Sequence, residues 1–243
     1  MKKYIVLLLA IFAQAAILPA ADFSLSAGGG GLFGYTFSRY TLEGGMVKST
    51  QSMDRLNYGG GLFFDAVYAE FTVMIQGGDH SYAEEMVYGT NTLTNGTGRG
   101  YETSLGFSLL GKYPFRINEK IFWFPLLGIE YQIALSEKRQ PEGGDIVYNR
   151  TKGYLPEDRD KDGKPYPLSA WNSWWIDVGA GLDYNLVGPL FLRGELIFGF
   201  RLPTGYEMGA LEVVKNPPTN VKDPKLKGLT GGPALKISIG YHI

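Results

Sequence analysis

The closing stretch of the chain, Leu235-Lys236-Ile237-Ser238-Ile239-Gly240-Tyr241-His242-Ile243, alternates between apolar side chains and polar or small ones. Successive side chains of a β-strand point to opposite faces. The period of two therefore predicts a strand with one apolar face and one polar face.

The same alternation recurs in earlier segments, which brings the predicted number of strands to eight. Most of them run for roughly 10–15 residues, longer than the usual strand of about 5–6 and suited to a tilted membrane-crossing strand of about 9–11 with extensions. The eight segments are 23–37, 56–66, 69–76, 101–113, 123–136, 174–184, 190–201 and 235–243.

The first residues have the order of a secretory signal. Lys2 and Lys3 precede an apolar run over 4–13, and Pro19-Ala20-Ala21 follows. The run is short for a membrane span, so we expect residues 1–21 to be a signal peptide cleaved after Ala20 or Ala21. A retained anchor helix is the alternative. Residues 22–243 then form one domain, which works outside the cytoplasm.

Two architectures use the same alternation, a water-soluble sandwich and a membrane barrel. The lengths of the connections favour the barrel, because short periplasmic turns and long extracellular loops alternate in bacterial outer-membrane barrels. Aromatic residues also fall at both ends of the apolar segments, as expected at the two membrane boundaries. The predicted short turns are 65–68, 114–120 and 187–189, and the predicted long loops are 41–54, 78–98, 137–172 and 203–228.

These features predict an all-β fold, an eight-stranded antiparallel up-and-down transmembrane β-barrel. It has short periplasmic turns and long extracellular loops, and it lies in the bacterial outer membrane as a monomer with both termini in the periplasm. Outer-membrane lipid is its expected surrounding.

The composition excludes several other classes. The 243 residues include no cysteine, 44% hydrophobic residues and two histidines, with a formal net charge of -1. These values exclude disulfides and thiolate metal sites and argue against a nucleic-acid binder. The mean hydropathy of -0.08 argues against a polytopic helical membrane protein.

Enzyme chemistry finds little support, and we expect no enzyme and no cofactor. His80 lies between Asp79 and Ser81, but neighbours on a strand point to opposite faces and cannot form a triad. A lipid-modifying activity is the weaker alternative. His242 falls at the periplasmic rim, where a hydrogen-bonded histidine is favoured over a ligand or base.

The segments Phe63-Phe64-Asp65-Ala66-Val67-Tyr68-Ala69-Glu70 and Phe124-Pro125-Leu126-Leu127-Gly128-Ile129-Glu130-Tyr131 resemble those of small spirochaetal outer-membrane barrels. The whole mature chain is similar to the OmpW-like and OmpA-transmembrane-like eight-stranded proteins. The final strand is similar to the signal read by the barrel-insertion machinery, with Ile243 where an aromatic residue is more usual. This resemblance implies a barrel and passage of small hydrophobic solutes, with a lateral exit as one route.

Inside an eight-stranded barrel there is room for side chains or for one small ligand. Glu130, Arg193, Glu195 and Lys236 face inward at mid-height by parity. Charges removed from water must be paired, so we expect a structural network of salt bridges, with an ion path as the alternative.

A narrow cavity is the second expectation for the lumen. Glycines at inward positions leave the wall of the first two strands bare, and inward apolar side chains line the space. The expected lining is Gly28, Gly30, Gly34, Gly59, Gly61, Met74, Leu110, Phe191 and Ile197. A structural barrel or a narrow channel for small hydrophobic solutes is thus the preferred function.

The longest predicted loop supports two further hypotheses. Asp158, Asp160, Asp162 and Gly163 match the first half of a calcium loop, but Ser169 stands where the bidentate Glu belongs. A solvated acidic turn is favoured over weak calcium binding, and no other metal site is expected. The mixed charges of 137–172 fit an exposed segment that binds host ligands, so a surface adhesin is the alternative function.

Overall fold

In a computed structural model, residues 25–44, 47–66, 68–141, 148–149, 168–205 and 225–243 are described. The predicted signal peptide lies outside these residues. Within them, eight long strands dominate, joined by a short 3-10 helix, η2 (Leu168–Trp171), and two short strands, β5 (Phe115–Arg116) and β7 (Tyr148–Asn149). The long strands are β1 (Ser26–Gly44), β2 (Val47–Ala66), β3 (Ala69–Tyr88), β4 (Asn91–Lys112), β6 (Ile121–Pro141), β8 (Ser173–Asn185), β9 (Leu190–Arg201) and β10 (Lys225–His242).

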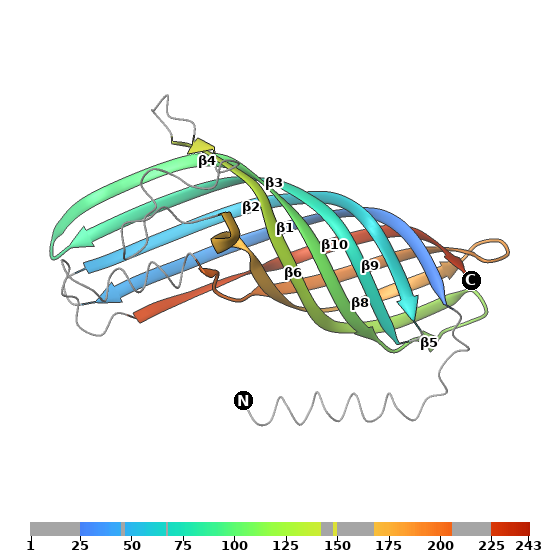
Figure 1. Cartoon of the computed structure of the whole chain (residues 1–243). Helices are drawn as coiled ribbons and strands as arrows, with labels where there is room; N and C mark the ends of the chain where they lie inside the picture. The colour runs from blue at the N-terminus through green and yellow to red at the C-terminus, as the bar shows by residue number, and fades with distance from the viewer. Residues whose placement is uncertain (1–24, 45–46, 67, 142–147, 150–167, 206–224) are drawn as a thin grey trace, which may run out of the picture.

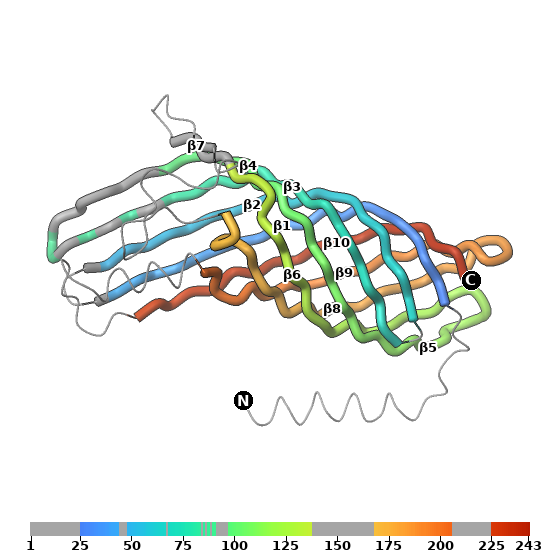
Figure 2. Tube along the Cα trace, viewed as in Figure 1, coloured from blue at the N-terminus to red at the C-terminus, as the bar shows by residue number. Residues whose placement is uncertain are grey.

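The long strands form a closed ring in which each pairs antiparallel with the next in sequence, as Figure 1 and Figure 2 show. The first and last strands meet, with Ser26 opposite His242, and β4 pairs with β6 to complete the circuit. The backbone N–H of Ile243 also donates to the carbonyl of Leu25, over 2.7 Å. The predicted eight-stranded up-and-down barrel is confirmed.

The apolar face of each strand points out of the barrel. Leu62, Ile75 and Leu196 are 71%, 60% and 62% exposed, while their neighbours Phe63, Met74 and Ile197 are buried. A water-soluble sandwich would bury the first set between its sheets. Apolar side chains all around a closed ring require lipid outside, so the chain is an outer-membrane β-barrel.

Aromatic rings mark both edges of this apolar band. At the edge near the short turns, Tyr68 stacks on Tyr113 with ring centres 5.7 Å apart, and Phe115 stacks on Trp123 at 4.8 Å. At the opposite edge, Tyr58 lies 6.5 Å from Tyr101. Amphipathic rings at both boundaries are typical of transmembrane barrels.

The extracellular ends differ from expectation in one respect. Residues 41–54 and 78–98, which were predicted as loops, belong mostly to strands. β1 extends to Gly44 and β2 starts at Val47. β3 and β4 are joined by a turn at Gly89, whose φ of 62° suits a residue without Cβ. The predicted loops 137–172 and 203–228 are also shorter than expected, since β6 runs to Pro141 and β10 begins at Lys225. Among the described residues, no helix reaches the length and apolarity that a membrane-crossing helix needs.

A bulge in β6 changes which face its outer end presents. The register with β4 shifts between Thr103 and Ser104, so that Ser136 and Ala134 are their partners and Leu135 is the extra residue. Odd positions below the bulge point outward, whereas Glu137 above it is buried. The bulge thus directs an acidic side chain into the barrel.

Candidate functional site

The most distinctive site is centred on Arg193, whose side chain enters the lumen from β9 near the periplasmic turns. Its Nε and Nη2 donate to the two carboxylate oxygens of Asp183, each over 2.7 Å. Asp183 is the residue directly opposite Arg193 on β8. A bidentate pair of this kind fixes the guanidinium in position and direction.

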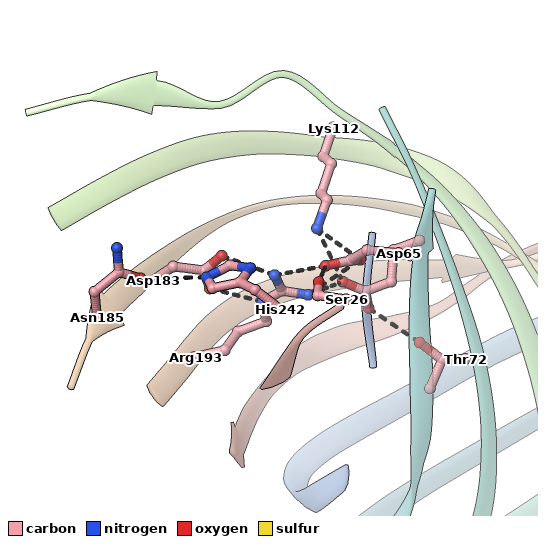
Figure 3. Close-up of polar contacts among 9 residues, drawn as sticks. Ser26, Asp65, Thr72, Lys112, Asp183, Asn185, Arg193 and His242 are labelled. Atoms are coloured by element: carbon pink, nitrogen blue, oxygen red, sulfur yellow. Dashed lines mark hydrogen bonds and ion pairs between the residues drawn. The ribbon is translucent and has the colours of Figure 1, made fainter. Parts of the chain in front are cut away.

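Two further carboxylates reach the same guanidinium from the other side of the lumen. Nη2 of Arg193 donates to Asp65 Oδ2 over 2.8 Å, and Nη1 donates to Glu70 Oε2 over 2.8 Å. Asp65 is the second-to-last residue of β2 and Glu70 is the second residue of β3, so one short turn brings both acids to the site. Figure 3 shows Arg193 between Asp183 and Asp65.

Lys112 supplies the second positive charge from β4. Its Nζ lies 2.6 Å from Asp65 Oδ1 and 3.9 Å from Glu70 Oε2. Two hydroxyl groups donate further hydrogen bonds to these carboxylates: Ser26 donates to Asp65 over 2.7 Å, and Thr72 donates to Glu70 over 3.0 Å. Three acids and two bases, all buried, are therefore joined in one connected network.

Aromatic rings enclose the cations. The Arg193 guanidinium carbon lies 4.6 Å from the ring centre of Phe63, 5.0 Å from Phe191 and 5.2 Å from Phe124. Lys112 Nζ lies 5.1 Å from Phe124 as well. At these distances the ring faces attract the cations in a site without bulk water.

The network and its rings draw on every long strand, and we name them together the Arg193 plug. Its members are Ser26 (β1), Phe63 and Asp65 (β2), Glu70 and Thr72 (β3), Lys112 (β4), Phe124 (β6), Asp183 (β8), Phe191 and Arg193 (β9), and His242 (β10), whose ring stacks on Phe191 at 4.5 Å. A buried ion needs paired charges and hydrogen bonds to offset its lost hydration. This arrangement supplies both, and its side chains reach into the lumen from every long strand.

The four inward charges predicted from sequence occupy different places. Arg193 is the centre of the plug, and Glu195 lies directly opposite Lys236 one inward step above it. Glu130 instead accepts hydrogen bonds from Gln76 and Gln132, over 3.0 and 2.6 Å. Sequence reasoning missed the three carboxylates that pair with Arg193, which are Asp65, Glu70 and Asp183. It also missed Lys112, which pairs with Asp65.

A small chamber lies above the plug, with a volume of about 50 Å³. Its lining mixes apolar groups with polar and charged side chains, including Arg55, Gln76, Glu130, Asp177 and Lys236. Such a volume suits a few water molecules. Pockets for small-molecule ligands measure about 300–1,000 Å³.

The residues predicted to line a cavity are placed as follows. Ile197 borders the chamber, and Leu110 packs with Phe124, Leu126 and Ile197 in a buried apolar cluster. Met74 is buried. The five predicted glycines adjoin atoms of their neighbours. A Cβ at Gly28 or Gly30 would come within 2.3 Å of a β10 carbonyl oxygen, and one at Gly59 or Gly61 within 2.3 Å of a β3 carbonyl oxygen. One at Gly34 would lie 3.0 Å from the Pro233 carbonyl oxygen of β10. They let the strands approach one another.

Other inward and outward residues follow the strand alternation. Above the chamber, Arg55 Nη1 lies 2.7 Å from Glu102 Oε2. His80 is buried inside the barrel, whereas Asp79 and Ser81 are exposed outside it. His242 Nε2 lies 3.4 Å from Asn185 Oδ1 at the periplasmic rim. The calcium candidates Asp158, Asp160 and Asp162 lie outside the described residues.

Three solved structures are similar to this chain. Neisserial surface protein A shares 11% identity, covering 88% of this chain and 97% of its own, with a TM-score of 0.34. The outer membrane protein OprG from Pseudomonas aeruginosa shares 13% (90% and 95%, TM-score 0.40). The attachment invasion locus protein Ail of Yersinia pestis, solved with a heparin analogue, shares 12% (91% and 100%, TM-score 0.31).

No family model matches the sequence, and no curated protein matches it. The assignment of the barrel rests on the closed ring of strands and on the apolar side chains that surround it.

Proposed function

We propose that this protein is a sealed outer-membrane barrel that acts at its extracellular end, as a surface-interaction protein. The observation that carries the proposal is the Arg193 plug, which crosses the lumen with side chains from all eight long strands. A barrel closed in this way anchors a structure at the cell surface and does not conduct along its axis.

The depth of the plug supports its role as a seal. Arg193, Glu70, Asp65, Phe124 and Phe191 are each no more than 1% exposed. Passage of a solute would have to separate three carboxylates from two cations, and an unpaired buried charge costs several kcal/mol, about 3–5 when one partner is lost. Transport of small hydrophobic solutes along the axis would therefore require the plug to rearrange.

The extracellular end offers a surface on which such a protein can act. We name the parts of β1–β4 beyond the apolar band (39–44, 47–54, 80–88 and 91–100) the extracellular extension. Its outer face is charged: Arg39 pairs with Asp54 over 2.8 Å, and Lys227 of β10 pairs with Glu43 over 3.0 Å. Charged side chains on the outward face place this part of the sheet in water.

The charges at the tip behave as solvated groups. Hydrogen bonding to Lys227, and the charge of that lysine, lower the pKa of the Glu43 carboxyl below its usual value of 4.5. Lys48 and Lys225 are the residues opposite Glu43 on the two neighbouring strands. The tip therefore carries a cluster of lysines around one carboxylate, suited to contacts with anionic surfaces.

Two measurements test the proposal. In planar bilayers the refolded protein should give no conductance steps above those of the bare bilayer. When displayed on a cell that does not itself adhere, the full chain should increase adhesion to host material. Replacement of residues 142–167 by a short turn, combined with neutralisation of the lysine cluster at the tip, should abolish that increase. Channel activity of the unmodified protein, or adhesion that survives the replacement and the neutralisation of Lys48, Lys225 and Lys227, contradicts it.

A further inference from the structure

A cleft of about 440 Å³ lies on the outer wall of the barrel, where the apolar band meets the extracellular extension. It is open to the surroundings of the barrel and is separate from the lumen. Its lining combines rings, charges and backbone of β1–β4, namely Tyr35, Asp54, Leu56, Asp79, His80, Ser81, Arg99 and Gly100.

The register of the strands fixes the depth of this cleft. Tyr35 lies opposite Leu56, Leu56 lies opposite Asp79, and Asp79 lies opposite Tyr101, so one level crosses all four strands. Tyrosines at this level, with Leu56 beside them, are typical of the layer where lipid headgroups meet hydrocarbon. The charged residues of the cleft thus lie at headgroup depth.

One acid of the cleft, Asp54, already has its hydrogen-bond partners within the protein. Asp54 accepts two hydrogen bonds from Nη2 of Arg39, over 2.9 and 2.8 Å, and one from the Tyr35 hydroxyl over 2.5 Å. These bonds hold its carboxylate in place. Because Arg39 neutralises its charge, Asp54 adds no unpaired charge to the wall of the cleft.

The other acid of the cleft, Asp79, and its base, Arg99, are less fully hydrogen-bonded than Asp54. Asp79 accepts a long hydrogen bond of 3.3 Å from Tyr58, and the exposed Arg99 guanidinium has no hydrogen bond or ion pair with the side chains that the structure describes. Arg99 lies two residues from Tyr101, the partner of Asp79, and so occupies the diagonal position on the same face. One cation and one anion thus occupy diagonal positions on the outer face, each with capacity for a ligand.

We propose that this cleft binds the headgroup of a membrane phospholipid that carries a primary ammonium, as in phosphatidylethanolamine. The phosphate accepts hydrogen bonds from Arg99, and the ammonium donates to Asp79, so that the opposite charges of headgroup and cleft match. A quaternary ammonium has the same charge but no N–H to donate. Phosphatidylcholine is therefore the matched control ligand.

The wall below the cleft suits the acyl chains of such a lipid. Two outward steps below Tyr35 and Leu56, Gly31 lies opposite Gly60. A Cβ added at either residue would find only backbone carbonyl oxygens, at 3.6 and 3.4 Å. The bare backbone of β1 and β2 leaves a shallow depression in the apolar band, beneath the Tyr35 and Leu56 side of the cleft.

The test uses the full refolded protein, in vesicles with equal amounts of phosphatidylethanolamine, phosphatidylcholine and phosphatidylglycerol. The lipids retained on release into mild detergent are counted by native mass spectrometry. The unmodified protein should retain phosphatidylethanolamine in preference to the other two. Arg99→Gln should lower that retention about tenfold, the effect of one charge-assisted hydrogen-bond pair. Asp79→Asn should remove the preference over phosphatidylcholine.

Arg116→Gln is the matched control, because Arg116 is an exposed arginine at the periplasmic end of the barrel. It should retain lipids as the unmodified protein does. Each variant is first shown to be folded by its heat-modifiable mobility in electrophoresis. Equal retention of the three lipids, unchanged retention by Arg99→Gln, or recovery of a second protein copy in place of lipid would each overturn the proposal.

Discussion

The guanidinium of Arg193 and the carboxylate of Asp183 face each other across two neighbouring strands, joined by two hydrogen bonds of 2.7 Å. The pair is one side of a network in which the same guanidinium holds two more acids from the far wall of the lumen. Opposite walls of the barrel are thereby tied together at one point.

Arg193→Met tests how much this tie stabilises the barrel. The substitution keeps an unbranched side chain but leaves Asp65, Glu70 and Asp183 with Lys112 as the only cation of the plug. We expect a loss of about 3–5 kcal/mol in the free energy of unfolding, typical of a broken buried ion pair. Urea titration of the refolded protein in lipid measures it. Arg116→Met, at an exposed position, should change stability by less than about 0.5 kcal/mol, and equal midpoints for the two variants would contradict the role of the plug.

Opening the plug should create a conducting path. We expect the double variant Arg193→Ala, Phe124→Ala to give conductance steps in planar bilayers, because it removes the central cation and a ring that covers it. The unmodified protein should give none. The control removes the same two residue types from exposed positions, as Arg116→Ala, Phe64→Ala, and should remain silent. A silent double variant that is folded would mean that the lumen is sealed at a second level.

Substitution of two glycines tests whether glycine is needed for close packing between strands. A Cβ at Gly30 would lie 2.2 Å from the Ile237 carbonyl oxygen, whereas one at Gly194 finds nothing within 4 Å. Gly30→Val should therefore prevent or strongly slow folding, since overpacking costs about 1–3 kcal/mol or more. Gly194→Val should fold as well as the unmodified chain. The folded fraction from band-shift electrophoresis distinguishes them, and similar fractions would count against the close approach of β1 and β10.

The depth of the apolar band predicts a graded response to charge. Leu196 is 62% exposed near the middle of β9, and Leu190 begins the same strand near the periplasmic boundary. Leu196→Arg should cost about 2–4 kcal/mol, and Leu190→Arg about 0–1, as arginine does at the midplane and at the edge of a bilayer. Unfolding free energies in vesicles measure both. Equal costs at the two positions would place the band at another height.

Strand alternation predicted the ring and its orientation because lipid imposes one apolar face on every crossing strand. The same rule failed at 41–54 and 78–98, where β1–β4 continue. There Thr41, Thr50 and Thr97 belong to strands with water on the outside, so neither face needs to be apolar. Without that contrast, a strand has no period of two to detect.

The alternation of residues could not predict the partners of Arg193, for a different reason. Parity indicates which charges point inward, but the ones that meet depend on the stagger of strands around the whole ring. A signal was present nevertheless. Asp65, Glu70, Lys112, Asp183 and Arg193 all lie within a few residues of the short turns, so inward charges of both signs gather at one height.

The unequal lengths of the strands give the mouth of the cylinder an oblique rim. At the extracellular end β9 stops at Arg201, opposite Thr230, while β10 continues to Lys225 beside β1 and the hairpins of β1–β4 rise further, as Figure 1 shows. With 12 residues in β9 and 20 in β2, the high side exceeds the low side by roughly 25 Å of strand. Among the described residues, the barrel wall therefore stands high over β1–β4 and low over β8 and β9, so the extracellular strand ends present an asymmetric edge.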